Sequence, residues 1–324
     1  MKSDIERIYS IDIIRGIAIM GIFLININSF ISEKAYENLQ DSLYGVITGL
    51  LIHGKFHFIF AFLFGVGSHI FLSRLNKKGL SNWTYIRRMS LLFVFGLLNA
   101  MMTAPDVLMG YAVIGIIFFG FMRFNKYFLL VLALILTLSV DIYYLIHHFT
   151  RITISNGVVN GFVVGQTLGH MLLGYTMYGI GLFDLKTKKY FVRKIWIGTF
   201  ILSIGIVALQ LGYGLKLTLL ASVLGLMYIT GTLLVLEYKN IYKWCKGLVA
   251  YGQMSLTNYI IQSICGITFI ASQVTTVNEA ILYSLLIFIV QIIFSNVWMK
   301  YFHFGPLEWL WRTGTYMTVP KFKK

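Results

Sequence analysis

Polar and ionisable residues recur inside the apolar runs of this chain, and the first run shows the pattern. The stretch IDIIRGIAIMGIFLININSF (residues 11–30) carries Asp12, Arg15 and Asn26. In a helix, Asp12 and Arg15 share a face at i, i+3, and Asn26 follows Arg15 by about three turns. A guanidinium binds oxyanions such as phosphates, so this polar stripe could line a substrate site. An ion pair at the helix end, with an amide that joins two helices, explains the pattern equally well.

A second set of candidates lies in HGKFHFIFAFLFGVGSHI, residues 53–70. His53 and His57 share a helix face at i, i+4, with Lys55 between them. A neutral imidazole is available near pH 7 and can act as a general base. We therefore select His57 and His53 as candidate catalytic residues and Lys55 as a candidate substrate-binding residue. Taken singly, each histidine is more typical of an interfacial residue with ordinary hydrogen bonds.

Further ionisable residues lie in later apolar runs or at their ends: Asp106, Asp141, His147, His148 and His170. An aspartate that positions a histidine base is compatible with these residues, although the sequence does not say which aspartate meets which histidine. We select Asp106 as a third catalytic candidate and His170 as a substrate-binding candidate. The paired histidines are adjacent and lack the i, i+4 spacing of metal ligands on one helix face. No metal site is expected.

Two motifs near the C-terminus add polar candidates. In GQMSLTNYIIQSICG (residues 252–266), Asn258 and Gln262 share a helix face, as residues of either a polar cavity or an interhelical hydrogen-bond network. In FHFGPLEWLWRTGTY (residues 302–316), the proline suits the first position of a helix. Glu308 and Arg312 then lie at i, i+4. This segment is predicted to be an interfacial anchor, or to place Glu308 or Arg312 near Asp12 and Arg15.

The elements that position these residues are predicted from apolar runs of about 20 residues, the length that spans a bilayer. The chain of 324 residues is 58% hydrophobic and only 12% charged, whereas soluble domains are about a quarter charged. We expect an all-α membrane protein with a single integral membrane domain over residues 1–324. About ten transmembrane helices are expected near residues 10–30, 54–73, 86–102, 106–122, 127–148, 162–183, 195–213, 216–236, 253–270 and 280–300, followed by a short interfacial helix.

The charge distribution predicts the orientation of these helices. Most of the 27 lysines and arginines fall in alternate connectors and at the two termini. The opposite connectors hold only Lys34, Lys55, Arg151 and Lys216. Positively charged connectors stay in the cytoplasm, so we expect both termini inside, in the plasma or inner membrane of a cell. The net charge of +15 is then a topology signal that also suits anionic lipids, and no nucleic acid partner is expected.

Five motifs carry a family resemblance over nearly the whole chain. IDIIRGIAIMGIFLININSF, GKFHFIFAFLFGVG, PDVLMGYAVIGI, GQMSLTNYIIQS and YFHFGPLEWLWR resemble, in order and spacing, those of the bacterial YeiB-like membrane proteins. The D-x-x-R-G opening and the multi-helix architecture are distantly similar to transmembrane acyltransferases of the heparan-α-glucosaminide N-acetyltransferase type. That resemblance implies acyl transfer from cytoplasmic acyl-CoA to an extracytoplasmic sugar or envelope acceptor, with no permanently bound cofactor.

Two positions depart from the pattern of the relatives. Gln253 stands where many relatives have arginine, and Asn99 stands where a histidine is frequent. The histidine that the eukaryotic enzymes use does not align with His53 or His57, so the catalytic assignment above is inferred from position and chemistry. A transporter or lipid-handling protein and a non-catalytic scaffold remain as alternatives, although the chain lacks the two-halves repeat that many transporters show.

Overall fold

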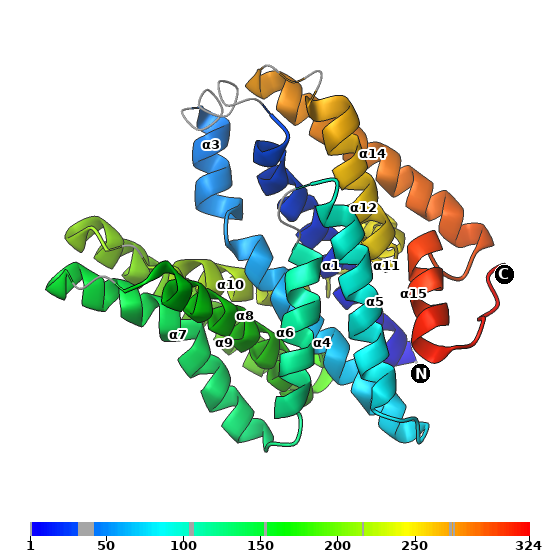
Figure 1. Ribbon diagram of the computed structural model, residues 1–324, viewed down its shortest axis with the longest axis horizontal. Coiled ribbons are helices and arrows are strands. Elements are labelled where there is room, and N and C mark those ends of the chain that lie inside the picture. The colour runs from blue at the N-terminus through cyan, green and yellow to red at the C-terminus, as the bar shows by residue number, and fades with distance from the viewer. Residues whose placement is uncertain are drawn as a thin grey trace. The chain divides into compact units, whose positions relative to one another are not determined.

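The computed structural model describes residues 2–31, 42–103, 107–151, 154–215, 217–271, 274 and 276–324 (Figure 1). These residues are almost entirely helical, and within them the β-structure is limited to one isolated bridge between Phe302 and Lys323. The all-α class expected from the sequence is thereby confirmed. The chain divides into two compact units, which are described separately. Unit 1 comprises residues 1–56, 81–113 and 239–324, and unit 2 comprises residues 57–80 and 114–238.

Unit 1 is built from the following helices: α1 (Lys2–Asn26), η1 (Ile27–Ser29), α3 (Leu43–Ile47), η2 (Thr48–Ile52, a π-helix), α5 (Trp83–Ala100), α11 (Lys239–Gln253), α12 (Ser255–Cys265), η3 (Gly266–Ile270, a π-helix), α14 (Val277–Tyr301) and α15 (Pro306–Tyr316). Unit 2 contains most of α4 (Lys55–Lys77) together with α7 (Lys126–Thr150), α8 (Asn156–Ile180), α9 (Leu185–Tyr213) and α10 (Leu219–Val235). Helix α6 (Val107–Phe121) begins in unit 1 and continues in unit 2.

Each of the ten predicted segments contains a helix, and the interfacial helix is also present, as α15. The sequence reading missed α11, because KNIYKWCKGLVAYGQ is amphipathic rather than continuously apolar. The predicted break before residue 216 is real: α9 ends at Tyr213, and the next residue, Gly214, has a φ of 64°, the left-handed conformation that glycine adopts easily.

Five segments in the described part of the chain are long and apolar enough to cross a membrane: Tyr9–Asn26, Leu43–Lys77, Lys126–Thr150, Leu185–Tyr213 and Asn278–Tyr301. Helices α10 and α11 pass the same test as a pair, which would raise the number to six. These helices indicate a membrane protein. The ten spans, the inside location of both termini and the single domain stay predictions.

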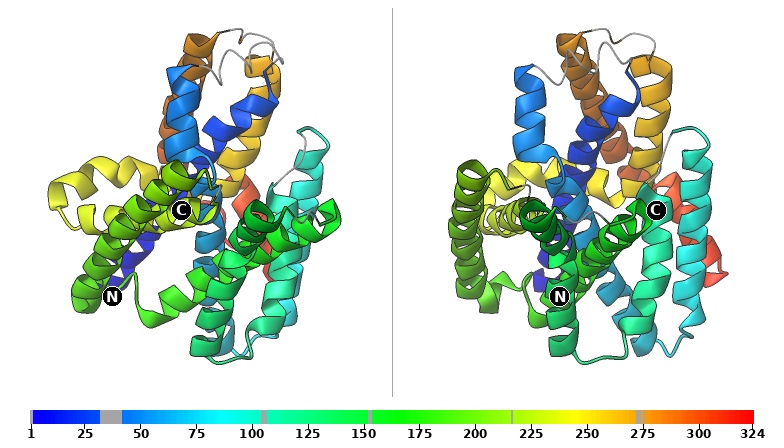
Figure 2. Two further views of the ribbon diagram at one scale, coloured as in Figure 1. Left: turned by 90° about the vertical axis from the view of Figure 1, so that its left-hand side faces the viewer. Right: turned by 60° about the vertical axis from the view of Figure 1, so that its left-hand side comes forward.

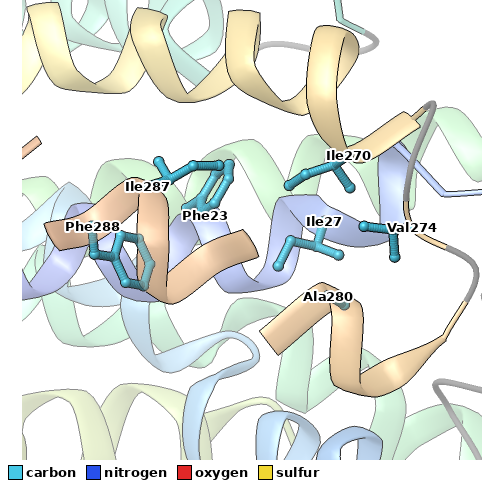
Figure 3. Packing of buried hydrophobic residues seen from close by; sticks show 7 residues of the cluster. All are labelled: Phe23, Ile27, Ile270, Val274, Ala280, Ile287 and Phe288. Atoms are coloured by element: carbon cyan, nitrogen blue, oxygen red, sulfur yellow. The ribbon is translucent and has the colours of Figure 1, made fainter. Parts of the chain in front are cut away.

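Helix α1 is held in unit 1 by a close approach of its backbone to α11. A Cβ atom on Gly252 of α11 would collide with the carbonyl oxygen of Asp12, and one on Gly16 of α1 would lie 3.2 Å from the carbonyl oxygen of Leu248. Small residues at such crossings are typical of membrane helices, because the contact relies on van der Waals packing. Further along the chain, Phe23 of α1 and Ile27 of η1 pack with Ile270, Ala280 and Phe288 from η3 and α14 (Figure 3).

Unit 2 uses the same kind of contact between its helices. A Cβ atom on Gly65 of α4 would collide with the carbonyl oxygen of Met171, and one on Gly174 of α8 would collide with that of Phe62. Helices α7 and α8 run side by side, as do α9 and α10 (Figures 1 and 2). At the first of these pairs, a Cβ atom on Gly169 would lie 2.9 Å from the carbonyl oxygen of Ala133. The glycines thus set how closely α8 approaches its neighbours.

The α1–α11 crossing can be tested with one methyl group. Replacing Gly252 with alanine should destabilise the protein by about 1–3 kcal/mol, because the added Cβ must displace the α1 backbone. Thermal unfolding of the purified protein in detergent would measure the loss. Gly247→Ala on the same helix is the matched control, since its Cβ would meet its nearest atoms at 3.7 Å, an ordinary contact. Equal melting temperatures for the two variants would contradict this account of the crossing.

Candidate functional site

Asp12 is the centre of a polar contact that joins α1 to α11. The guanidinium of Arg15 donates to Asp12 Oδ1 at 2.9 Å, and the amide of Gln253 donates to Asp12 Oδ2 at 3.1 Å. Asp12 is almost fully buried, whereas the Arg15 side chain is 27% exposed. The predicted pairing of Asp12 with Arg15 is confirmed. Gln253 provides a hydrogen bond without a charge, so Arg15 is the cation that neutralises this carboxylate.

Arg88 of α5 is a second cation in unit 1, and α15 holds it in place. Its guanidinium lies over the ring of Trp311 at 3.7 Å, and the Trp311 indole donates to the Arg88 carbonyl oxygen at 2.9 Å. Figure 1 shows α5 and α15 side by side. Stacking on an aromatic face is one of the contacts that arginine makes and lysine makes less well. Trp311 therefore fixes both the backbone and the charge of Arg88.

Arg15 and Arg312 both lie close enough to Arg88 to repel its charge, and the hydroxyl groups of Tyr85 and Tyr316 are near it as well. Arg312 itself is exposed and lies over the ring of Phe304 at 4.8 Å. We call Arg15, Arg88 and Arg312 the basic cluster. In the described part of unit 1, the carboxylate paired with this cluster is that of Asp12. Three guanidiniums gathered in this way form a positively charged group suited to an oxyanion.

Glu308 does not take part in this cluster, because it caps another helix. Its carboxylate accepts hydrogen bonds from the backbone N–H groups of Leu256 and Thr257 at 2.7 and 3.0 Å and from the Thr257 hydroxyl at 2.6 Å. These donors lie in the first turn of α12, where N–H groups have no partner within the helix. The sequence left open whether Glu308 points to the membrane surface or under the helices, and the structure places it against α12.

The pKa of the Glu308 carboxyl is raised above its ordinary value, because burial disfavours the charged form. The hydrogen bonds from Thr257 and Leu256 act in the opposite direction without cancelling the effect of burial. A carboxyl with a raised pKa stabilises the folded state most fully below its unfolded pKa of about 4.3. That contribution is lost as the pH rises through the folded pKa.

Asn258 and Gln262 lie on the predicted common face, within a buried network of α11, α12 and α14. Gln262 donates to the Tyr251 hydroxyl at 2.8 Å and to Gln291 Oε1 at 3.2 Å. Asn258 donates to the carbonyl oxygen of Tyr251 and to the Ser295 hydroxyl, both at 3.0 Å. All of these side chains are buried. The interhelical reading of this motif is confirmed, and a substrate role for the two amides stays a prediction.

The other candidates of unit 1 make few or local contacts. Lys55 is buried, and its ammonium donates to the carbonyl oxygen of Gly49 at 3.0 Å in the helix that precedes it. His53 is exposed at the end of that π-helix. Asn26 is partly buried at the end of α1. Asp106, the third catalytic candidate, lies outside the described residues.

Unit 2 contains two of the predicted site residues, His57 and His170, both partly buried. The Nε2 atom of His170 lies 3.0 Å from the hydroxyl of Ser222 on α10. Asp141 of α7 accepts a hydrogen bond from the Thr218 hydroxyl at 2.9 Å and one from the backbone N–H of Leu219 at 3.0 Å. Asp141 therefore caps the start of α10.

Sequence reasoning missed Arg88 and Trp311 as site residues. Arg88 belongs to the basic pair Arg87–Arg88, which was read only as a topology signal, and Trp311 was read as an interfacial anchor. A run of two arginines at a helix start carries no information about stacking on a helix more than two hundred residues away.

Within the described residues, no group of three or more His, Cys, Asp or Glu side chains is arranged to hold a metal ion.

The role of Glu308 can be tested by changing its acceptors and its charge separately. Glu308→Ala leaves the N–H groups of Leu256 and Thr257 without an acceptor, at a cost of about 1–3 kcal/mol for each buried donor. Glu308→Gln keeps one acceptor oxygen and should be less destabilising. The stability of the wild-type protein should also fall as the pH rises through the Glu308 pKa, and this fall should be absent in Glu308→Gln.

Thermal unfolding in detergent between pH 4 and pH 9, with both variants beside the wild type, would measure these effects. Pro306→Ala is a control within the same helix that leaves the carboxylate in place. Equal stability of Glu308→Ala and the wild type at every pH would show that the cap does not support α12.

Comparison with known proteins shows which sequences this chain is similar to. Residues 177–318 match a family described as "Protein of unknown function (DUF418)". The chain is 29% identical to an uncharacterized 39.9 kDa protein from the amylase 3' region of Bacillus acidopullulyticus, over 96% of this chain and 94% of that protein. It is 24% identical to the uncharacterized protein YxaH of Bacillus subtilis strain 168, over 97% and 95% of the two chains.

A third relative is the uncharacterized protein YeiB of Escherichia coli strain K12, which is 25% identical over 96% of both chains. No solved structure matches the chain. The matches cover nearly the whole length of each protein, as the five sequence motifs do. The chain thus resembles the YeiB-like proteins over nearly its whole length, as its five motifs predicted, and the match to the DUF418 family lies in its C-terminal part.

Proposed function

We propose that this protein is a membrane-embedded acyltransferase that moves an acyl group from cytoplasmic acyl-CoA to a sugar or another acceptor of the cell envelope. The observation that carries the proposal is the basic cluster, in which Arg15 and Arg312 lie close enough to Arg88 to repel its charge and Arg15 stays partly exposed beside Asp12. The donor of this reaction carries several phosphate groups. Guanidiniums bind such groups through paired, charge-assisted hydrogen bonds.

The cluster is arranged so that a bound anion would lower its energy. Three like charges within electrostatic range repel one another, and burial strengthens this repulsion. Asp12 and Gln253 hold Arg15, and Trp311 holds Arg88, so neither guanidinium is free to move far from the others. The exposed fraction of Arg15 and the exposure of Arg312 leave donor groups available to a ligand.

In the proposed topology, the basic cluster lies on the cytoplasmic side of the membrane. We propose ten spans with both termini in the cytoplasm of a bacterium and the chain in its plasma or inner membrane, because the basic connectors then lie inside. The starts of α1 and α5 and the whole of α15 belong to the cytoplasmic side in this arrangement. Acyl-CoA is a cytoplasmic donor, and the envelope acceptor would approach from the opposite face.

Gln253 bears on the proposal because the family resemblance implies an arginine at this place. A second arginine beside Asp12 would compete with Arg15 for the carboxylate. With the neutral Gln253 amide there, Asp12 keeps its hydrogen bond across the α1–α11 contact at 3.1 Å. Arg15 then remains paired with Asp12 through a single nitrogen, and its remaining N–H groups can bind a donor phosphate.

A transporter is the second candidate, and one observation favours it. Helices α10 and α11 qualify as a membrane span only as a pair, with a break between them. Interrupted spans are common at the substrate sites of transporters. Uptake or counterflow of a solute into proteoliposomes, without any acyl-CoA chemistry, would support this function over acyl transfer.

The donor site predicts a loss of acyl-CoA affinity when its charges are removed. Arg15→Gln and Arg88→Gln should each weaken acyl-CoA binding about 10-fold or more, since one charge-assisted contact to a phosphate contributes about 1.5–3 kcal/mol. Binding would be measured by calorimetry on the purified protein in nanodiscs. Lys243→Gln is the matched control, because it removes one exposed cation of α11 that lies outside the cluster.

Loss of affinity in all three variants would point to non-specific attraction by the positive net charge. No measurable acyl-CoA binding by the wild type would contradict the donor assignment. A melting temperature for each variant would separate a weakened site from a misfolded protein.

The orientation is tested by chemical labelling in intact cells. In a chain whose Cys245 and Cys265 are replaced by serine, Ser155→Cys should react with a membrane-impermeant maleimide added from outside. Ser81→Cys should react only after the cells are opened. Both serines are exposed and lie in connectors that the proposal assigns to opposite faces. The reverse labelling pattern would overturn the inside location of the termini.

A further inference from the structure

Three helices of unit 2 face one another through pairs of polar residues one turn apart. Gln166 and His170 lie on α8, and Thr218 and Ser222 lie at the start of α10. Gln166 donates to the Thr218 hydroxyl at 2.8 Å, and His170 meets the Ser222 hydroxyl at 3.0 Å. The two contacts lie one helical turn apart between α8 and α10, so the Gln166–Thr218 contact limits how far His170 and Ser222 can move relative to each other.

Asp141 of α7 holds the Gln166–Thr218 contact in place. It accepts from the Thr218 hydroxyl and from the N–H of Leu219, so it holds the first turn of α10 in place. Gln166 also donates to the carbonyl oxygen of Thr137 at 3.1 Å, which joins α8 to α7. Ser222 therefore sits one turn beyond a start of α10 that is tied to both neighbouring helices. A hydroxyl that must meet one particular nitrogen needs this kind of support.

The hydrogen bond of Ser222 differs from those of other buried hydroxyls in unit 2. Thr176, Ser203 and Thr230 each donate to a carbonyl oxygen three or four residues earlier in their own helix. Such back-bonding is the ordinary state of serine and threonine within helices. Ser222 bonds instead to the imidazole of another helix. Helix packing alone does not require this choice, because the backbone acceptor is available to a serine in any helix.

The tautomer of His170 sets which partner donates in this hydrogen bond. Ser222 is 6% exposed, and a buried hydroxyl proton without an acceptor costs about 1–3 kcal/mol. In a nucleophile–base pair Ser222 donates its proton to Nε2 of His170, which then carries a lone pair. The neutral imidazole then holds its own proton on Nδ1. This is the arrangement of a serine nucleophile and its base.

We infer that Ser222 and His170 form a nucleophile–base pair that takes up an acyl group as an ester on the Ser222 oxygen. The inference rests on the proposed function for the identity of the donor, an acyl thioester. Ser222 Oγ attacks the thioester carbonyl carbon, a carbon–oxygen bond forms, and the carbon–sulfur bond breaks. The Ser222 proton passes to His170 Nε2 and then to the departing thiolate.

The second half of the reaction returns the pair to its starting state. A hydroxyl or amine of the acceptor attacks the ester carbonyl, and its proton passes through His170 Nε2 to the Ser222 oxygen. The product carries the acyl group as an ester or amide. Burial of Ser222 would keep water from the acyl ester, which favours transfer over hydrolysis. The Phe58 ring packs edge-to-face with the His170 imidazole, with their centroids 4.8 Å apart, and further encloses it.

The reactivity of Ser222 can be measured on the wild-type protein without any acyl donor. A fluorophosphonate probe reacts with activated serines, and mass spectrometry of the purified protein in nanodiscs should find its adduct on Ser222. His170→Gln should slow this labelling about 100-fold, the usual contribution of a general base. Ser203→Ala is the matched control, because Ser203 is equally buried and bonds to its own helix. Absence of the adduct in the wild type, or labelling unchanged in His170→Gln, would overturn the inference.

A second measurement separates this inference from the proposed function. Wild type, Ser222→Ala and Ser203→Ala would be incubated with radiolabelled acetyl-CoA, and the label followed onto protein and membrane glycans. Label on Ser222 in the wild type, with transfer lost only in Ser222→Ala, would support both proposals. Transfer at the wild-type rate in Ser222→Ala would overturn the acyl-serine and leave the acyltransferase standing. An adduct of the probe on Ser222 without transfer from acetyl-CoA would support the pair and contradict the proposed donor.

Discussion

The packing of unit 1 depends on the junction between α11 and α12. There the Glu308 carboxylate accepts hydrogen bonds from backbone N–H groups, as a helical carbonyl would. The change of helix at Met254 leaves the N–H groups of Leu256 and Thr257 without helical acceptors, and the Glu308 carboxylate accepts both. Asn258 donates to the carbonyl oxygen of Tyr251 on the other side of the break. Buried backbone groups of this kind must find their hydrogen-bond partners within the protein.

Unit 2 meets the same constraint at the start of α10, where the Asp141 carboxylate accepts from Thr218 and Leu219. Lys55 serves the opposite end of a helix, since its ammonium donates to the Gly49 carbonyl oxygen within the π-helix before it. Carboxylates at helix starts and a cation near a helix end both complement the helix dipole. Several ionisable residues that looked like site candidates therefore bond to the backbone of helices that begin or end within the protein.

The chemical proposals rest on residues whose side chains do not cap helices. Arg15 stays partly exposed beside Asp12, and Arg15 and Arg312 lie close enough to Arg88 to repel its charge. In unit 2, the Ser222 hydroxyl bonds to His170 instead of to its own helix. Glycines allow these arrangements by bringing the backbones together, as Gly252 does beside Asp12 and Gly174 does beside Phe62.

The sequence by itself determined the all-helical class, the approximate place of ten helices and the Asp12–Arg15 pair, because apolar runs and i, i+3 spacing are local properties. It did not predict α11, whose amphipathic pattern contains no long apolar run. Only the tertiary structure decided that Asp12 meets Gln253, that Glu308 caps α12 and that His170 meets Ser222. Those partners lie 241, 51 and 52 positions apart. Helical spacing says which face of a helix a side chain occupies, whereas the packing of whole helices determines what lies opposite it.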